Sequence, residues 1–244
     1  MARIFITGSA DGLGLLAAKQ LIDQGNQVVL HARNKERARQ ALTQASSAEN
    51  VLIGDLSSIE ETKKLADDVN ALGKFDAVIH NAGVYQVSGQ LILYINTLAP
   101  YVLTSSIERP KRLIYLTSGM HKQGKLNLHE LITKIDRISY SDSKLHVLML
   151  SKAVARKWPE VYSNSVDPGW VPTKMGDQGA PDDLQKGYET QTWLAVSNDV
   201  DALVTGHYFH HQRFDHYNRQ ADDVSLQEKL LKACEDITGV PFPK

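Results

Sequence analysis

The chain has 244 residues, 42% of them apolar and 23% charged, and its formal net charge at pH 7 is −1. These values are ordinary for a soluble globular protein long enough to bury a sizeable core. The chain has 27 basic and 28 acidic side chains, so it has no strong net electrostatic field to attract nucleic acid or an acidic membrane surface.

A single cysteine, Cys234, excludes an internal disulfide and a cysteine-based metal site. The N-terminus leads directly into a strand-like run, without the basic and apolar regions of a targeting peptide. The longest apolar-leaning stretch, 91–103, is too short to span a bilayer. We therefore expect a cytoplasmic protein with no membrane span and no resident metal.

Short apolar runs alternate with longer helical patterns along the chain. Strands are predicted, in order, at RIFIT (3–7), QVVLHA (27–32), VLIGDL (51–56), DAVIHNAG (76–83), RLIYLTS (112–118), VYSNSVDPG (161–169) and HYFHH (207–211). Helices are predicted at 13–25, 35–46, 56–72 and 141–158. The strands are rich in Val, Ile and Leu rather than alternating, which is typical of a parallel sheet covered on both faces. The pattern predicts an α/β fold, one doubly wound domain over 1–244, with ligands beyond the carboxyl ends of the strands.

The loop TGSADGLG (7–14) lies between the first strand and the first helix, and it contains Gly8, Gly12 and Gly14. A helix N-terminus offers unpaired N–H groups to a phosphate, and glycines let a pyrophosphate approach the backbone. A tight turn alone would also explain glycines, and the spacing G-x3-G-x-G differs from G-x-G-x-x-G. The setting between a strand and a helix favours a dinucleotide site.

The end of the second strand reads HARN, with Arg33 and no carboxylate. In a dinucleotide site, an acidic residue at this position would hold the ribose 2′-hydroxyl, whereas a basic residue would accommodate a 2′-phosphate. Given the glycine loop, Arg33 favours NADP(H) over NAD(H). The nearby KERAR stretch (35–39) is interpreted as a solvated helix face.

Tyr140 and Lys144 lie four residues apart at the start of a helical run, so they share one face of the helix. Such a pair can also be a surface accident. Next to a dinucleotide, a phenol can donate a proton to a carbonyl oxygen, and a nearby ammonium is expected to lower its pKa. Ser118, at the end of a predicted strand, could donate a second hydrogen bond to the same oxygen.

The chain resembles the short-chain dehydrogenase/reductase family, because TGSADGLG, HARN, DL (55–56), NAG (81–83), Asn96, Ser118, YSDSK and DPGWVPT (167–173) follow one another in family order. The segment 117–127 and the tail resemble the retinol-dehydrogenase and ketoreductase branch. The resemblance implies a Rossmann-type fold and an oxidoreductase that interconverts a carbonyl and an alcohol, acting as an NADP(H)-dependent reductase. It implies a catalytic set of Asn96, Ser118, Tyr140 and Lys144. It also implies that NADP(H) is bound by Gly8, Gly12, Leu13, Gly14, Arg33, Asp55, Leu56, Asn81, Ala82, Gly83, Tyr140, Lys144, Pro168, Gly169, Val171 and Thr173.

The sequence departs from the family pattern after Gly83, because only twelve residues separate it from Asn96. Because of this shortening, the sequence does not fix the position of Asn96, nor whether the protein forms a homo-oligomer. The small-molecule substrate is expected to contact mainly 84–95, 119–139 and 170–200, where Met120, Trp170 and Met175 could equally belong to the core.

Two other functions remain open on the sequence. One is a non-catalytic NADP(H)-binding redox sensor, which would have no need of Asn, Ser, Tyr and Lys together. The other is a nucleotide-sugar epimerase or dehydratase, which shares the Tyr-x3-Lys pair but usually has a substantial C-terminal substrate domain.

Overall fold

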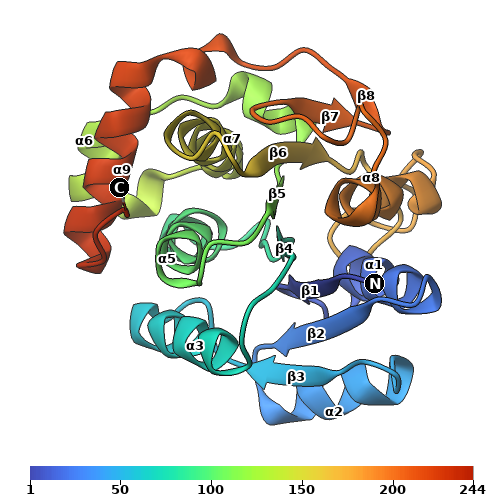
Figure 1. Cartoon of the computed structure of the whole chain (residues 1–244). Helices are drawn as coiled ribbons and strands as arrows, with labels where there is room; N and C mark the ends of the chain where they lie inside the picture. Colours follow the sequence, from blue (N-terminus) through green and yellow to red (C-terminus); the bar gives the residue numbers. More distant parts are fainter. Residues whose placement is uncertain (244) are drawn as a thin grey trace.

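The structure, a computed structural model, describes residues 1–243 apart from the side chain of Ile132. Its centre is one eight-stranded sheet in the order β3-β2-β1-β4-β5-β6-β7-β8 (Figure 1). All neighbouring strands are parallel except the last pair, β7 and β8. The strands are β1 Arg3–Ile6, β2 Gln27–Ala32, β3 Asn50–Ile53, β4 Ala77–His80, β5 Arg112–Leu116, β6 Tyr162–Asp167, β7 Tyr208–His210 and β8 Arg213–Phe214.

Helices cover both faces of this sheet, as the sequence predicted. In Figure 1, α1, α2 and α8 lie on one face, and α3, α5, α7 and α9 lie on the other. The α-helices are α1 Gly12–Asp23, α2 Lys35–Gln44, α3 Ile59–Ala71, α4 Gly89–Ile92, α5 Ala99–Ser106, α6 Leu128–Thr133, α7 Tyr140–Lys157, α8 Leu184–Val196 and α9 Val224–Thr238. Short 3-10 helices span Gly119–Gln123, Ile135–Arg137 and Arg219–Asp222.

The first strand shows why the sheet lies between two helix layers. Its side chains alternate between the faces, so Ile4 and Ile6 join the apolar core under α1, α2 and α8, while Phe5 joins the core under α3, α5 and α7. All three side chains are fully buried. A strand buried on both faces needs apolar residues at every position, which is the continuous run seen in the sequence.

The segment after Gly83 begins as a short loop and is then helical without a break from Gly89 to Ser106. Helix α4 continues through a π-helical stretch, Leu93–Leu98, into α5. Asn96 lies inside the π-helical stretch, and its side chain is 1% exposed. Single π-helical turns widen an α-helix locally and are frequent at functional sites.

The strand order reverses between β1 and β4, which are neighbours in the sheet although β2 and β3 lie between them in sequence. The connections after these strands leave in opposite directions, so a crevice opens beyond their carboxyl ends. The glycine loop follows β1 and the NAG segment follows β4, so both lie at this crevice. In the described part of the chain, no helix is both long and apolar enough to cross a bilayer.

Candidate active site

The glycine loop closes one end of the crevice with backbone that only glycine accommodates. Gly8 and Gly12 have φ values of +64° and +55°, in the left-handed region. A Cβ on Gly8 would lie 2.9 Å from the Cα of Ala82, and one on Gly14 would overlap with Gly8 O and the Asn81 amide. A Cβ on Gly12 would meet no protein atom within 4 Å, so this glycine faces open space.

The first turn of α1 is left open to a ligand. Its N-cap residue, Asp11, makes no side-chain cap, unlike Asn34 before α2 and Ser58 before α3. The Asp11 carboxylate instead pairs with Arg37 and, at 3.0 Å, with Lys174 Nζ. The first N–H groups of α1 are therefore available to an anion, where the helix dipole also favours negative charge.

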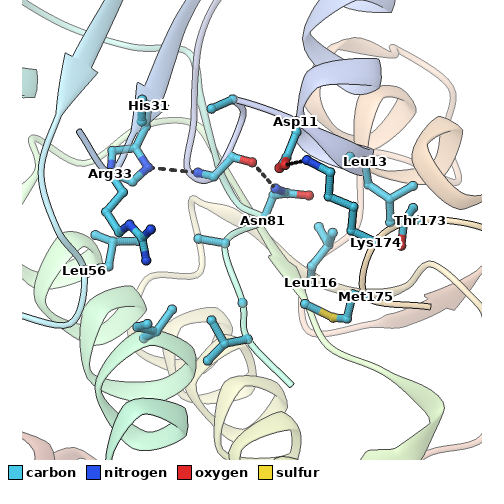
Figure 2. Close-up of a pocket in the computed structure, with 18 of the residues that line it drawn as sticks. Asp11, Leu13, His31, Arg33, Leu56, Asn81, Leu116, Thr173, Lys174 and Met175 are labelled. Carbon is cyan, nitrogen blue, oxygen red and sulfur yellow. Dashed lines mark hydrogen bonds and ion pairs between the residues drawn. The ribbon is translucent and has the colours of Figure 1, made fainter. Parts of the chain in front are cut away.

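His31 fastens the glycine loop to the sheet. Its Nδ1 accepts a 2.9 Å hydrogen bond from Gly8 N, and its Nε2 lies 2.9 Å from Gly54 O, which fixes the tautomer with the proton on Nε2. Burial lowers the pKa of His31 to about 4, so the ring stays neutral near pH 7. Asn81 holds the opposite side of the loop, because its Nδ2 donates to Thr7 O at 2.9 Å and to Gly8 O at 3.2 Å (Figure 2).

A cavity of about 520 Å³ extends along this loop and past the ends of β2 and β4. Arg33 lies on its wall near Leu56, as Figure 2 shows. Arg37, which follows on α2, lines the same wall and is half-buried. The interpretation of KERAR as a wholly solvated face is therefore wrong for Arg37, since the turn at Asn34 directs it toward the cavity and its Asp11 partner.

Helix α7 begins with Tyr140 and brings it beside Lys144. A capping box formed by Ser139 and Asp142 fixes this helix start. The Lys144 ammonium lies 5.4 Å from the centre of the Tyr140 ring and donates a 2.9 Å hydrogen bond to Leu116 O. Both side chains line the cavity.

The electrostatics of this pair differ from the expectation. Burial raises the pKa of Tyr140 to about 12, with a smaller opposing contribution from a hydrogen bond with Ser118 and a further increase from the negative charge of Asp167. Burial also lowers the pKa of Lys144 to about 8, while the charge of Asp167 partly offsets the decrease. Desolvation is the largest influence on the Tyr140 pKa, so the expected lowering beside Lys144 is not seen. Tyr140 is thus in the protonated form near neutral pH.

Asn96 lies behind the cavity wall rather than on it. Its Oδ1 accepts from Val84 N at 2.8 Å, and its Nδ2 donates to Val84 O and to Ser143 Oγ, each at 3.0 Å. A Cβ on Gly83 would lie 3.2 Å from Lys144 Nζ and 3.5 Å from Asn96 Oδ1. The side chain of Asn96 therefore ties the loop after β4 to helix α7.

A second cavity, of about 790 Å³, adjoins the first one. Tyr140 lines both cavities, and Ser118 lines the second. The wall of the second cavity contains the exposed apolar side chains Tyr85, Met120, Trp170 and Met175. These residues therefore do not belong to the hydrophobic core. A phenol at the junction of a glycine-lined cleft and an apolar cavity can serve reactants from both sides.

The predicted site residues mostly lie on these two cavities. The first is lined by Gly8, Gly12, Leu13, Arg33, Asp55, Leu56, Asn81, Ala82, Gly83, Tyr140, Lys144, Pro168 and Thr173. The second is lined by Leu13, Ser118, Tyr140, Pro168, Gly169, Val171 and Thr173. Only Gly14 and Asn96 line neither, and both lie directly behind the wall.

Sequence reasoning missed several residues of the site. His31, Arg37, Lys174 and Asp167 were given no role, although HARN and DPGWVPT contain two of them. The available signal was the position of Arg37 in the first turn of the helix that follows HARN, close to Arg33 along the chain. The partners of His31 lie 23 residues away along the chain, so no local pattern reveals them. No group of three or more metal-ligating side chains is present in the described residues.

Comparison with known proteins gives the same family over the whole chain. The short chain dehydrogenase family profile matches residues 2–97. The short-chain dehydrogenase chyC of Penicillium rubens is 43% identical, with all of both chains covered. More distant are a candidate daunorubicin C-13 ketoreductase, DnrU, of Streptomyces sp., 27% identical over 97% of this chain and 92% of that protein, and retinol dehydrogenase 14 of Mus musculus, 25% identical over 97% and 86%.

Solved structures share the fold. A protein of Mycobacterium paratuberculosis superposes with a TM-score of 0.83 at 22% identity, covering 100% of this chain and 96% of that chain. The Pseudomonas aeruginosa RhlG/NADP complex superposes with a TM-score of 0.71 at 20% identity, covering 85% and 93%. The sheet order, the site geometry and the 43% identity to chyC lead to one conclusion: this chain belongs to the short-chain dehydrogenase/reductase family.

Proposed function

We propose that this protein is an NADP(H)-dependent carbonyl reductase. The observation that carries the proposal is the position of Tyr140, a protonated phenol at the junction of the two cavities and beside Lys144. A proton donor at this junction can meet a carbonyl oxygen held in the second cavity while a dinucleotide lies in the first.

The first cavity suits a dinucleotide phosphate. The open backbone at Gly12 and the uncapped start of α1 provide room and N–H donors for a pyrophosphate. Arg33 and Arg37 provide two guanidinium groups where a 2′-phosphate would lie, and no carboxylate follows β2 to hold a free 2′-hydroxyl. The RhlG structure of the same fold was solved with NADP. When bound, NADPH supplies the hydride.

The remaining steps belong to the side chains. Ser118, which lines the second cavity, orients the carbonyl by donating a hydrogen bond to its oxygen. Tyr140 transfers its phenolic proton to the same oxygen, and Lys144 stabilises the resulting phenolate. Asn96 acts by positioning, because it joins the loop after β4 to α7 and so holds Gly83 and Lys144 in place.

The decisive experiment measures NADPH consumption over a panel of aldehydes, ketones and quinones by the wild-type protein and by Tyr140→Phe. This change keeps the ring and removes the proton, so turnover should fall by at least about a hundredfold while NADPH still binds. Tyr162→Phe, at the start of β6 and on the wall of neither cavity, is the matched control and should retain turnover.

Undiminished turnover in Tyr140→Phe would refute the assignment of Tyr140. A different outcome would indicate a redox sensor instead. In that case the wild-type protein binds NADPH, none of the carbonyl compounds supports its consumption, and NADPH binding causes the protein to gain or lose a protein partner.

A further inference from the structure

Asp167 is a buried carboxylate on the wall of the second cavity, which Ser118 and Tyr140 also line. It ends β6, is 8% exposed and lines that cavity. Its Oδ1 accepts from Gly169 N at 3.0 Å, and its Oδ2 accepts from the Tyr208 hydroxyl at 2.9 Å. A Cβ on Gly119, the residue after Ser118, would lie 2.9 Å from Oδ2. The absence of a side chain at Gly119 therefore lets this carboxylate lie directly beside the Ser118 segment.

The charge of Asp167 is only partly compensated by the protein, because it attracts the Lys144 ammonium without forming an ion pair with it. Within residues 1–243, its one ion-pair partner is His210, whose Nδ1 is 3.8 Å from Oδ2, and no lysine or arginine pairs with it. A carboxylate has about four acceptor positions, and two are used by the N–H of Gly169 and the O–H of Tyr208. Burying a charge with unfilled acceptor positions is unfavourable unless a further donor supplies the missing interactions.

The rest of the second cavity also favours a donor or a cation. Two further carboxylates, Asp177 and Asp182, lie on its wall. Lys174, a basic residue of the same wall, directs its ammonium to Asp11. Tyr85 and Trp170 provide aromatic surface, and aromatic rings attract positively charged nitrogen.

We propose that Asp167 is a specificity-determining residue that selects carbonyl substrates carrying a nitrogen with hydrogens to donate. The free acceptor positions of its carboxylate receive an N–H group of the substrate, while Ser118 and Tyr140 hold the carbonyl oxygen. The proposal rests on the reductase function above and adds the class of substrate. The N–H group is either an ammonium or an uncharged amine, and the probes below separate the two.

The test compares kcat/KM for acetophenone, its meta-amino derivative and its meta-aminomethyl derivative, with NADPH. The first has no N–H group, the second has an uncharged one and the third has an ammonium group. We expect both nitrogen compounds to exceed acetophenone, the ammonium compound by about tenfold or more, because hydrogen bonds between charged groups are the stronger ones.

Asp167→Asn keeps the shape of the side chain and can still accept from Gly169, but it removes the charge. The ratio of kcat/KM between the ammonium compound and acetophenone should fall about tenfold in this variant. A ratio is used because a general loss of structure would lower both values together. Asp201→Asn removes the same charge from an exposed position that lines neither cavity, so the ratio should change less than about twofold.

Each outcome supports or overturns the proposal. Equal kcat/KM for the three ketones in the wild-type protein overturns the proposal and leaves the reductase function intact. A preference for nitrogen compounds that persists in Asp167→Asn overturns the role of Asp167. If no ketone is consumed, the reductase function fails for this class, and calorimetric binding of the three ketones to the NADP(H)-loaded protein decides the inference. Equal Kd values then overturn it, and tighter binding of the nitrogen compounds that is lost in Asp167→Asn supports it.

Discussion

Deprotonation of Lys144 should lower the rate of carbonyl reduction in mildly alkaline solution. Burial lowers the pKa of this lysine from 10.5 to about 8, whereas the pKa of Tyr140 lies near 12. Near pH 7 about nine-tenths of the molecules therefore carry the ammonium, and near pH 9 about one-tenth do. In the proposed mechanism Lys144 must be charged to stabilise the Tyr140 phenolate, so kcat/KM for carbonyl reduction should fall about tenfold over this interval.

The assay follows NADPH absorbance at low ketone concentration from about pH 6 to about pH 10, because kcat/KM reports the protonation state of the enzyme before the ketone binds. Lys144→Arg is the matched variant. A guanidinium stays charged throughout this range, so the variant should be less active through altered geometry but should show no alkaline decrease.

A second variant connects the profile to the structure. The charge of Asp167 opposes the effect of burial on the Lys144 pKa, so Asp167→Asn should move the decrease to lower pH. A wild-type profile that stays flat to about pH 10, or the same decrease in Lys144→Arg, would refute the reasoning that this lysine controls the rate.

Three further predictions concern the cofactor and the fold. In fluorescence titrations, Arg33→Ala should raise the Kd for NADPH about tenfold or more and the Kd for NADH less than about twofold. The control variant Arg39→Ala, on the exposed side of α2, should change neither Kd. Equal increases in both Kd values for Arg33→Ala would contradict a contact with the 2′-phosphate. His31→Phe leaves Gly8 N and Gly54 O without their hydrogen-bond partner. In urea denaturation it should lower the free energy of unfolding by about 2–4 kcal/mol. An unchanged urea midpoint would show that water replaces the imidazole ring. The pKa of His31 is 6.5 in the unfolded chain and about 4 in the folded protein, so between these pH values the unfolded state binds more protons. The free energy of unfolding should therefore decrease by about 3 kcal/mol as the pH drops from about 6.5 to about 4. An equally steep decrease with pH in His31→Phe would contradict this prediction.

Short segments of the sequence were enough to predict the class of fold and most of the residues that line the two cavities, for a local reason. A strand buried on both faces must be apolar throughout, and a helix must begin at a capping residue, so the order of strands and helices is already written in short segments. Ser58, for example, caps α3 within the range 56–72 in which a helix is predicted. The glycine loop and the Tyr140–Lys144 pair are equally local, because each depends on residues within one turn or one helix face.

How these segments act on one another depends instead on the packing of the whole chain. The pKa of Tyr140 is raised rather than lowered because the side chain is buried, and no local spacing encodes that burial. Arg37 became part of the site through its pairing with Asp11, and Asp167 through its position beside Gly119 at the end of a neighbouring strand. Desolvation and long-range pairing depend on what the whole chain packs around a group, and the distances that set them exist only after the sheet has brought its strand ends together.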